Sequence, residues 1–237
     1  MQMSSFKITI VFDNYPFSPK LKTGFGFACV VETGEGRILF DTGSDGDVLL
    51  SNLANVNLKP QEIDAVVLSH NHWDHTGGLN DFLRENSDVN VYLPISFPDD
   101  FKTDVKRTGA RLTEVNESRI ISEGVYSTGE MQGIVNEQSL ICKTDDGSVV
   151  ITGCAHPGIT RILKRAEALY GPVFLTMGGF HLRDEKLSSL QRTVETFKEL
   201  GITRVCPSHC SGDNARSLFK KAYGDNCIMG GVGSIIS

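Results

Sequence analysis

The sequence predicts a mixed α/β fold in which two β-sheets pack together and helices cover their outer faces. Two observations support this prediction. The first half of the 237-residue chain is rich in short apolar runs that read as strands, and the second half alternates single strands with amphipathic helices. No linker or internal repeat interrupts the chain, so we expect one domain over residues 1–237.

The first half is expected to contain mainly strands. In order, its elements are a strand at 6–12, a turn-rich segment at 14–19, a hairpin of strands at 26–31 and 37–41, a short helix at 46–53 and a buried strand at 63–68. Residues 93–123 mix charged side chains with Pro98 and Gly109 and show less regularity. We expect this segment, together with residues up to 135, to shape the mouth of a pocket.

The hydrophobic period changes in the second half. The expected elements are strands at 124–128, 139–144 and 148–152, a helix at 159–169, a strand at 173–177, a helix at 187–197, a strand at 204–206 and a final helix at 215–222. Gly171-Pro172 and Gly201 end the first two helices, as expected of residues that stop a helix.

Composition narrows the class of protein. Hydrophobic residues make up 40% of the chain and charged residues 22%, which is typical of a globular domain. No apolar run is long enough to span a membrane, and no signal peptide is visible. The six cysteines show no disulfide framework, so we expect reduced thiols in a cytoplasmic protein. A net charge of −6 gives no basic face for nucleic acid, which leaves a small molecule as the expected partner. The oligomeric state is left open.

All six histidines lie where metal ligands are expected. The densest cluster is His70-x-His72-x-Asp74-His75, which directly follows the buried strand at 63–68. The other three, His156, His181 and His209, each follow an apolar, strand-like run. Open α/β sheets place their ligands beyond the ends of strands, and imidazole with carboxylate suits Zn²⁺, Fe or Mn²⁺. The pattern therefore predicts a metal centre.

The cluster, preceded by Leu-Phe-Asp-Thr-Gly at 39–43, closely resembles the metallo-β-lactamase superfamily. The resemblance implies a four-layer αββα sandwich. Two further motifs, Thr-Gly-Cys-Ala-His-Pro-Gly-Ile at 152–159 and Gly-Gly-Phe-His-Leu at 178–182, are similar to a subgroup. This subgroup is related to the archaeal 7,8-dihydropterin-6-methyl-4-(β-D-ribofuranosyl)aminobenzene 5′-phosphate synthase.

The resemblance also implies the ligands of one or two ions, with zinc expected and iron or manganese left open. The first ion would be held by His70, His72 and His156, and the second by Asp74, His75 and His209. The superfamily usually adds a bridging aspartate, but residues 174–181 contain no carboxylate. Either the ions share only a water, or His181 takes the place of the aspartate near the site. The alternative role for His181 is a hydrogen bond to a loop carbonyl.

Further residues are candidates for supporting roles, and each has a simpler alternative. Asp41 is expected to accept a hydrogen bond from a ligand histidine, or else to be a turn carboxylate. Cys154 could face the site as a thiolate ligand, but a small buried hydrophobe is the simpler interpretation. Trp73 is expected to be a packing wall. Glu130 and Glu137 are candidate substrate contacts, although surface loop acids explain them more simply.

The first functional hypothesis is a metal-dependent hydrolase, with Asp74 and His181 as the catalytic candidates. Metal-activated water would attack an ester or phosphoester of a small anionic substrate. One alternative is the subgroup's synthase-type condensing transferase, and another is a sensor that binds a ligand without turnover. Di-iron redox chemistry is disfavoured because His72 stands where the flavodiiron proteins have a carboxylate. The RNA-processing branch is disfavoured because its extra domain and basic surface are missing.

Overall fold

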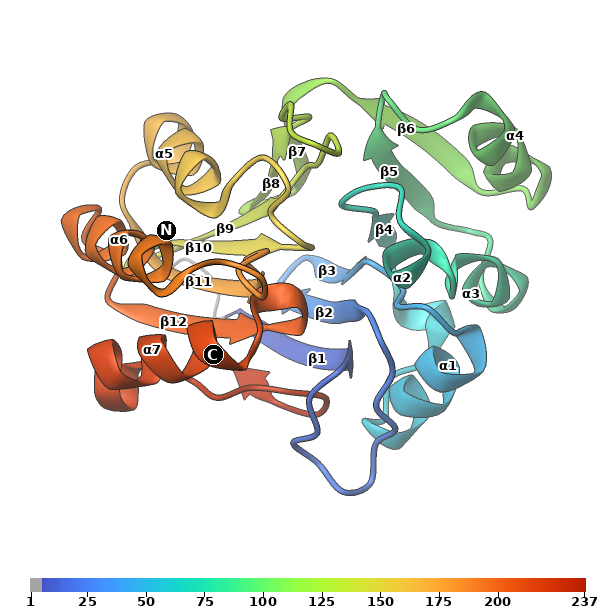
Figure 1. Cartoon of the computed structure of the whole chain (residues 1–237). Helices are drawn as coiled ribbons and strands as arrows, with labels where there is room; N and C mark the ends of the chain where they lie inside the picture. Colours follow the sequence, from blue (N-terminus) through green and yellow to red (C-terminus); the bar gives the residue numbers. More distant parts are fainter. Residues whose placement is uncertain (1–5) are drawn as a thin grey trace.

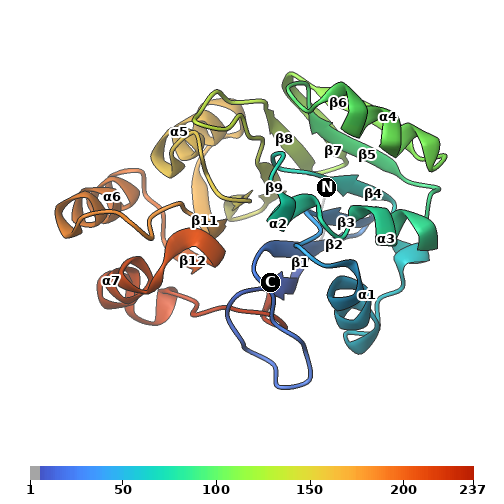
Figure 2. The same ribbon diagram turned by 45° about the vertical axis from the view of Figure 1, so that its right-hand side comes forward.

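Two mixed β-sheets pack face to face, and helices cover both outer faces (Figures 1 and 2). The computed structural model describes residues 6–237. The predicted mixed α/β architecture is confirmed. All six cysteines are free thiols. Within the described part of the chain, no helix has the length and apolar character needed to cross a membrane.

The first sheet has seven strands. In spatial order they are β13 (Ile235–Ile236), β1 (Lys7–Asp13), β2 (Phe27–Thr33), β3 (Gly36–Phe40), β4 (Ala65–Val67), β5 (Asn90–Pro94) and β6 (Arg111–Val115). Pairing is antiparallel from β13 to β3 and parallel from β3 to β6. The carboxyl ends of β3 and β4 therefore meet at one edge, which brings Asp41 next to the histidine cluster.

The second sheet has six strands. In spatial order they are β12 (Arg204–Ser208), β11 (Val173–Gly179), β10 (Gly147–Thr152), β9 (Leu140–Thr144), β8 (Val125–Gly129) and β7 (Glu117–Ser122). The three strands β10, β11 and β12 run parallel to one another. Because their carboxyl ends lie side by side, the loops that carry His156, His181 and His209 leave the sheet at the same edge.

Three buried hydrophobic clusters define the four layers. The central cluster joins the sheets, with Ile10 and Phe40 from the first sheet and Val149 and Leu175 from the second. The outer helices of the first sheet are α1 (Gly46–Asn55), α3 (Leu79–Glu85) and α4 (Asp99–Arg107). Those of the second sheet are α5 (Ile159–Tyr170), α6 (Leu187–Glu199) and α7 (Asp213–Tyr223). The predicted αββα sandwich is thus confirmed.

The expectation that residues 93–123 are irregular was wrong. They contain the end of β5 and all of α4, β6 and β7, and β6 joins β7 directly across Asn116. Each of these last two strands forms the edge of a sheet. Edge strands keep much of their surface in water and carry charged side chains, so they lack the apolar alternation that identifies a strand. Ile120 of β7, for example, is 63% exposed.

The packing between the sheets gives a first prediction. Leu175 of β11 is fully buried in the central cluster, away from the histidines. Leu175→Ala should lower the free energy of unfolding by about 2–5 kcal/mol, through lost burial and the cavity left behind. Urea denaturation measures this loss. The control Ile120→Ala, at an exposed position on β7, should change the same quantity by no more than about 0.5 kcal/mol. Equal losses in the two variants would contradict the central core.

Candidate metal centre

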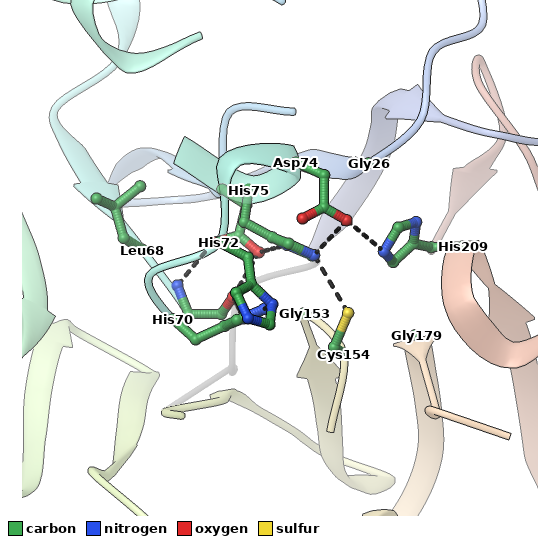
Figure 3. A network of polar contacts seen from close by, with 12 residues as sticks. Gly26, Leu68, His70, His72, Asp74, His75, Gly153, Cys154, Gly179 and His209 are labelled. Atoms are coloured by element: carbon green, nitrogen blue, oxygen red, sulfur yellow. Dashed lines mark hydrogen bonds and ion pairs between the residues drawn. The ribbon is translucent and has the colours of Figure 1, made fainter. Parts of the chain in front are cut away.

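The candidate metal centre lies where the facing edges of the two sheets meet. After β4 ends at Val67, the chain reaches His70 and His72 and then enters the short helix α2 (Trp73–Thr76), which carries Asp74 and His75. From the second sheet, His156 follows β10 and His209 begins a 3-10 turn after β12. The structure therefore brings all six expected ligands together, and Figure 3 shows several of them converging.

The first set of ligands is a triangle of imidazole rings. The ring centroid of His70 lies 4.7 Å from those of both His72 and His156. The rings of His72 and His156 are 4.9 Å apart. Nδ1 of His72 also lies 3.1 Å from Nε2 of His70. Three imidazoles at these separations can direct nitrogen atoms at one point.

The second set contains a carboxylate and two imidazoles. Oδ2 of Asp74 lies 3.6 Å from Nε2 of His75 and 3.3 Å from Nε2 of His209. Cys154 joins this set, because its Sγ lies 3.3 Å from Nε2 of His75 (Figure 3). One donor atom from each of these four side chains lies within 4.8 Å of the other three. The same limit holds for His70, Cys154 and His156.

The buried nitrogen atoms of this site could hold a cation. Among residues 6–237, both ring nitrogens of His156 are buried without a hydrogen-bond partner, and buried Nε2 of His209 has only the Asp74 carboxylate, 3.3 Å away. Burial lowers the pKa of each ring to about 4, with neighbouring histidines adding to the effect. Both rings are therefore neutral at pH 7 and offer lone pairs to a metal. A donor set of imidazole nitrogen, carboxylate oxygen and thiol sulfur fits a divalent ion such as Zn²⁺.

Asp41 orients two of the ligand histidines. Its buried carboxylate accepts hydrogen bonds from the backbone N–H of Ser69 at 2.6 Å and the Ser69 hydroxyl at 2.7 Å. It also accepts one from Nδ1 of His75 at 2.7 Å. Because the Ser69 proton goes to Asp41, the hydroxyl oxygen accepts from Nδ1 of His70 at 2.8 Å. Both rings thus carry their proton on Nδ1 and leave Nε2 for a metal.

The hydrogen bond between Asp41 and His75 also changes the pKa of His75. Burial alone would lower it, but the charge and hydrogen bond of Asp41 raise the pKa to about 9. The ring is then protonated at pH 7 without a metal. A metal that takes Nε2 must displace a proton, so binding is coupled to proton release.

Close packing holds His209 against the first sheet. Its Nδ1 lies 3.0 Å from Oδ1 of Asn14, and this same oxygen accepts the backbone N–H of Gly26 at 2.9 Å. Gly26 has a φ of +140°, and a Cβ there would lie 2.2 Å from the carbonyl oxygen of Asp74. Only glycine fits this approach, which places the second set of ligands next to the loop before β2.

The two candidate glutamates have structural roles. Glu137 is buried and accepts four backbone N–H groups, those of residues 153–156, at 2.8–3.1 Å. Glu137 is therefore not a surface loop acid, and it supports the turn that carries Cys154 and His156. A contact between Glu137 and substrate stays a prediction. Glu130 is half-buried and accepts from the backbone of Ser96 and the side chain of Asn136. It ties two loops together outside the metal centre.

The metal centre forms the floor of a cavity of about 660 Å³. His181 lies on its wall, with its ring 4.5 Å from that of His156, but it does not join either set of donors. Trp73 is 63% exposed and stacks on Phe25 at 5.8 Å, so the expectation that it is a packing wall was wrong. The Arg183 guanidinium lies 5.4 Å from the centre of the Phe25 ring.

Sequence analysis missed Phe25 and Arg183 as lining residues. Arg183 follows His181 by two residues, and this spacing was the one feature of the sequence that could have indicated its place on the cavity wall. Phe25 lies in an irregular loop before β2, where no pattern marks it. The wall of the cavity thus combines a stacked aromatic pair with the guanidinium of Arg183 and the carboxylates of Asp184 and Glu185.

Three comparisons place this geometry among known proteins. Residues 21–131 match the family model "Metallo-beta-lactamase superfamily". The chain is 27% identical to the 7,8-dihydropterin-6-methyl-4-(beta-D-ribofuranosyl)-aminobenzene-5′-phosphate synthase of Methanocaldococcus jannaschii, over 90% of this chain and 89% of that protein. It is similar to the crystal structure of a metal-dependent hydrolase of the beta-lactamase superfamily, with a TM-score of 0.83 and 26% identity, covering 98% of this chain and 99% of that one. The metallo-beta-lactamase fold protein YhfI of Bacillus subtilis has the same fold, with a TM-score of 0.75 and 16% identity over 99% of both chains.

The hydrogen bonds of Asp41 give a second prediction. Asp41→Asn preserves the shape of the side chain and tolerates the φ of 57° found there. It replaces one accepting oxygen with a donor, so it should weaken metal binding by about 10- to 100-fold. Competition with a chromogenic chelator measures the affinity. Asp64→Asn, which alters an exposed carboxylate that accepts from the backbone of Arg37, is the control. Equal affinities in both variants would contradict this role of Asp41.

The two histidines of the second sheet's last loops give a third prediction. His209→Ala should reduce the metal content per chain by one ion, because it removes a buried donor. His181→Ala should retain the wild-type content, since this ring lies outside both donor sets. Elemental analysis of the purified variants, loaded identically, measures the content. Loss of an ion in His181→Ala would instead make that residue a ligand.

Proposed function

Because this chain carries a domain of the metallo-beta-lactamase superfamily, we propose that it is a metal-dependent hydrolase of a small anionic molecule. The bond cleaved is an ester or phosphoester. The observation that supports this most directly is the cavity, whose floor holds the metal ligands and whose wall carries Arg183. Its volume of about 660 Å³ suits a small ligand, since such pockets span about 300–1,000 Å³.

The ligands divide into two groups in this proposal. His70, His72 and His156 hold one ion, and Asp74, His75 and His209 hold the other. Zinc is the proposed metal, because buried imidazole, carboxylate and thiol donors suit it, while iron or manganese would also accept the nitrogen and oxygen donors. When bound, a metal of this kind lowers the pKa of water towards 7 and polarises a carbonyl or phosphoryl oxygen.

The chain's own residues bind and orient the substrate. Arg183 attracts the anionic group, because a guanidinium pairs with carboxylate or phosphate through directed hydrogen bonds. Trp73, stacked on Phe25, offers an exposed aromatic face to an apolar or planar part of the substrate. His181 projects from the wall beside His156 and is positioned to give a proton to the leaving oxygen. Asp74 faces the cavity and orients the attacking water.

A panel of chromogenic substrates tests the proposal. The metal-loaded protein is incubated with 4-nitrophenyl esters of acetate, phosphate and a phosphodiester, before and after treatment with a chelator. We expect turnover of at least one anionic ester, loss of activity with the chelator and recovery when metal returns. Tight binding of anionic ligands without any turnover would contradict the hydrolase and support a sensor.

Arg183 gives a fourth prediction. Arg183→Ala should lower kcat/KM for an anionic ester by about tenfold or more, because it removes a charge-assisted hydrogen bond. A neutral ester should be affected little. Arg192→Ala is the matched control, since Arg192 belongs to α6 and lines the adjacent cavity instead. An equal loss on neutral and anionic esters would mean that Arg183 supports the fold of the wall and does not select charge.

The second candidate function is a synthase-type condensation. It is favoured by one observation, the 27% identity to the archaeal synthase over most of both chains. Fewer candidate substrate contacts remain for this reaction, because Glu137 accepts four backbone N–H groups and Glu130 accepts hydrogen bonds from two loops. Incubation with a dihydropterin that carries a diphosphate leaving group and with a ribofuranosyl aminobenzene phosphate, followed by mass spectrometry of the joined product and of released pyrophosphate, separates the two reactions. A joined product would favour the synthase.

A further inference from the structure

Cys154 is the one side chain common to the two groups of clustered donor atoms. Its Sγ groups with His70 and His156 on one side, and with Asp74, His75 and His209 on the other. We infer that the Cys154 thiolate is a bridging ligand between two metal ions. Figure 3 shows the sulfur pointing from the second sheet towards His75 and the Asp74–His209 pair. The inference depends on the metal binding proposed above but not on the reaction.

The turn that carries Cys154 is fixed in a way that suits a ligand. Glu137 accepts the N–H groups of residues 153–156, including that of Cys154 at 3.0 Å and that of His156 at 2.8 Å. Ala155 between them has a φ of 63°, in the left-handed region. A non-glycine residue in this region is uncommon and persists only where its surroundings hold it. The hydrogen bonds of Glu137 and the left-handed turn at Ala155 therefore direct Cys154 and His156 towards the same centre, although they are two residues apart.

The neighbouring strand leaves no room for another bridging side chain. At Gly179 in β11, a Cβ would lie 2.3 Å from the carbonyl oxygen of Gly153, 2.6 Å from Sγ of Cys210 and 3.2 Å from Cα of Cys154. At Gly153, a Cβ would lie 2.1 Å from Oγ of Ser69. Glycine at both positions therefore lets the segments on either side of Cys154 pack closely, and a Cβ at either position would clash with these neighbours.

Charge supports the same assignment. Asp74 is the only carboxylate in the two groups of donors that the described residues form, and the remaining nitrogen donors are imidazoles. Two divalent ions would bring four positive charges to a buried centre. A thiolate adds a second negative charge next to Asp74 and contacts both ions at once. Nε2 of His209 is buried and lies 3.3 Å from Oδ2 of Asp74, so one cation would draw a lone pair from each.

X-ray absorption on the zinc-loaded protein under reducing conditions tests this inference, alongside elemental analysis. With two ions per chain and a bridging thiolate, each zinc has on average about one sulfur neighbour at about 2.3 Å. A terminal thiolate on one ion gives an average of about one half. Cys154→Ser should lose the sulfur signal and one of the two ions. The matched control is Cys210→Ser, which alters the adjacent thiol and should preserve both.

The outcomes separate the possibilities without an activity assay. The bridge would be overturned by an average near one half of a sulfur neighbour per zinc, or by a single ion in the wild type. It would also be overturned if the sulfur signal were retained in Cys154→Ser or lost in Cys210→Ser. If Cys154→Ser does not fold, the sulfur count of the wild type and of Cys210→Ser still decides. Failure of the hydrolase assay with a sulfur count near one would leave the bridge intact and remove only the proposed reaction.

Discussion

The structure of the site depends on one buried carboxylate, that of Asp41. It lies directly after β3, in a left-handed conformation, and binds Ser69 after β4 and His75 in α2. Burial of a charge is costly unless it is paired and hydrogen-bonded, and here three donors satisfy it. The same contacts set the tautomers of His70 and His75. Because β3 and β4 are parallel neighbours, a single acid at the end of one strand can organise the ligands that follow the other.

A second buried carboxylate has the corresponding role on the opposite sheet. Glu137 gathers the four N–H groups of residues 153–156 and so determines where Cys154 and His156 lie. The two halves of the centre are therefore preorganised separately, one by Asp41 and one by Glu137. They meet at His70, whose Nδ1 is 2.8 Å from Oγ of Ser69 and 3.9 Å from Oε2 of Glu137. The cost of burying two acids is offset by backbone donors on both sides and by any cations bound between them.

The elements that could be predicted from the sequence are those with a clear local pattern of apolar or ligand residues. The buried strand before His70 and the alternating elements after Ile159 follow from apolar periodicity, and the H-x-H-x-D-H spacing marks the ligands. The strands β6 and β7 escaped detection because exposed edges do not need the apolar alternation. Glu137 was misjudged because a loop glutamate looks the same in sequence whether it faces water or four backbone amides. For Cys154 the sequence favours a small hydrophobe and leaves a thiolate ligand as the alternative, because the position of its sulfur depends on contacts between residues far apart in the chain.

The division between floor and wall explains why hydrolase and synthase are hard to distinguish from the metal ligands alone. The ligands sit at strand ends and in turns held by buried carboxylates, so they provide a rigid floor that suits either reaction. The residues that would distinguish substrates, Trp73, Arg183 and the exposed Ile134, lie on the wall of the cavity. Changes there alter charge and shape without disturbing Asp41 or Glu137. Variants of the wall, such as those at Arg183, therefore test the choice of substrate more directly than variants of the candidate metal ligands.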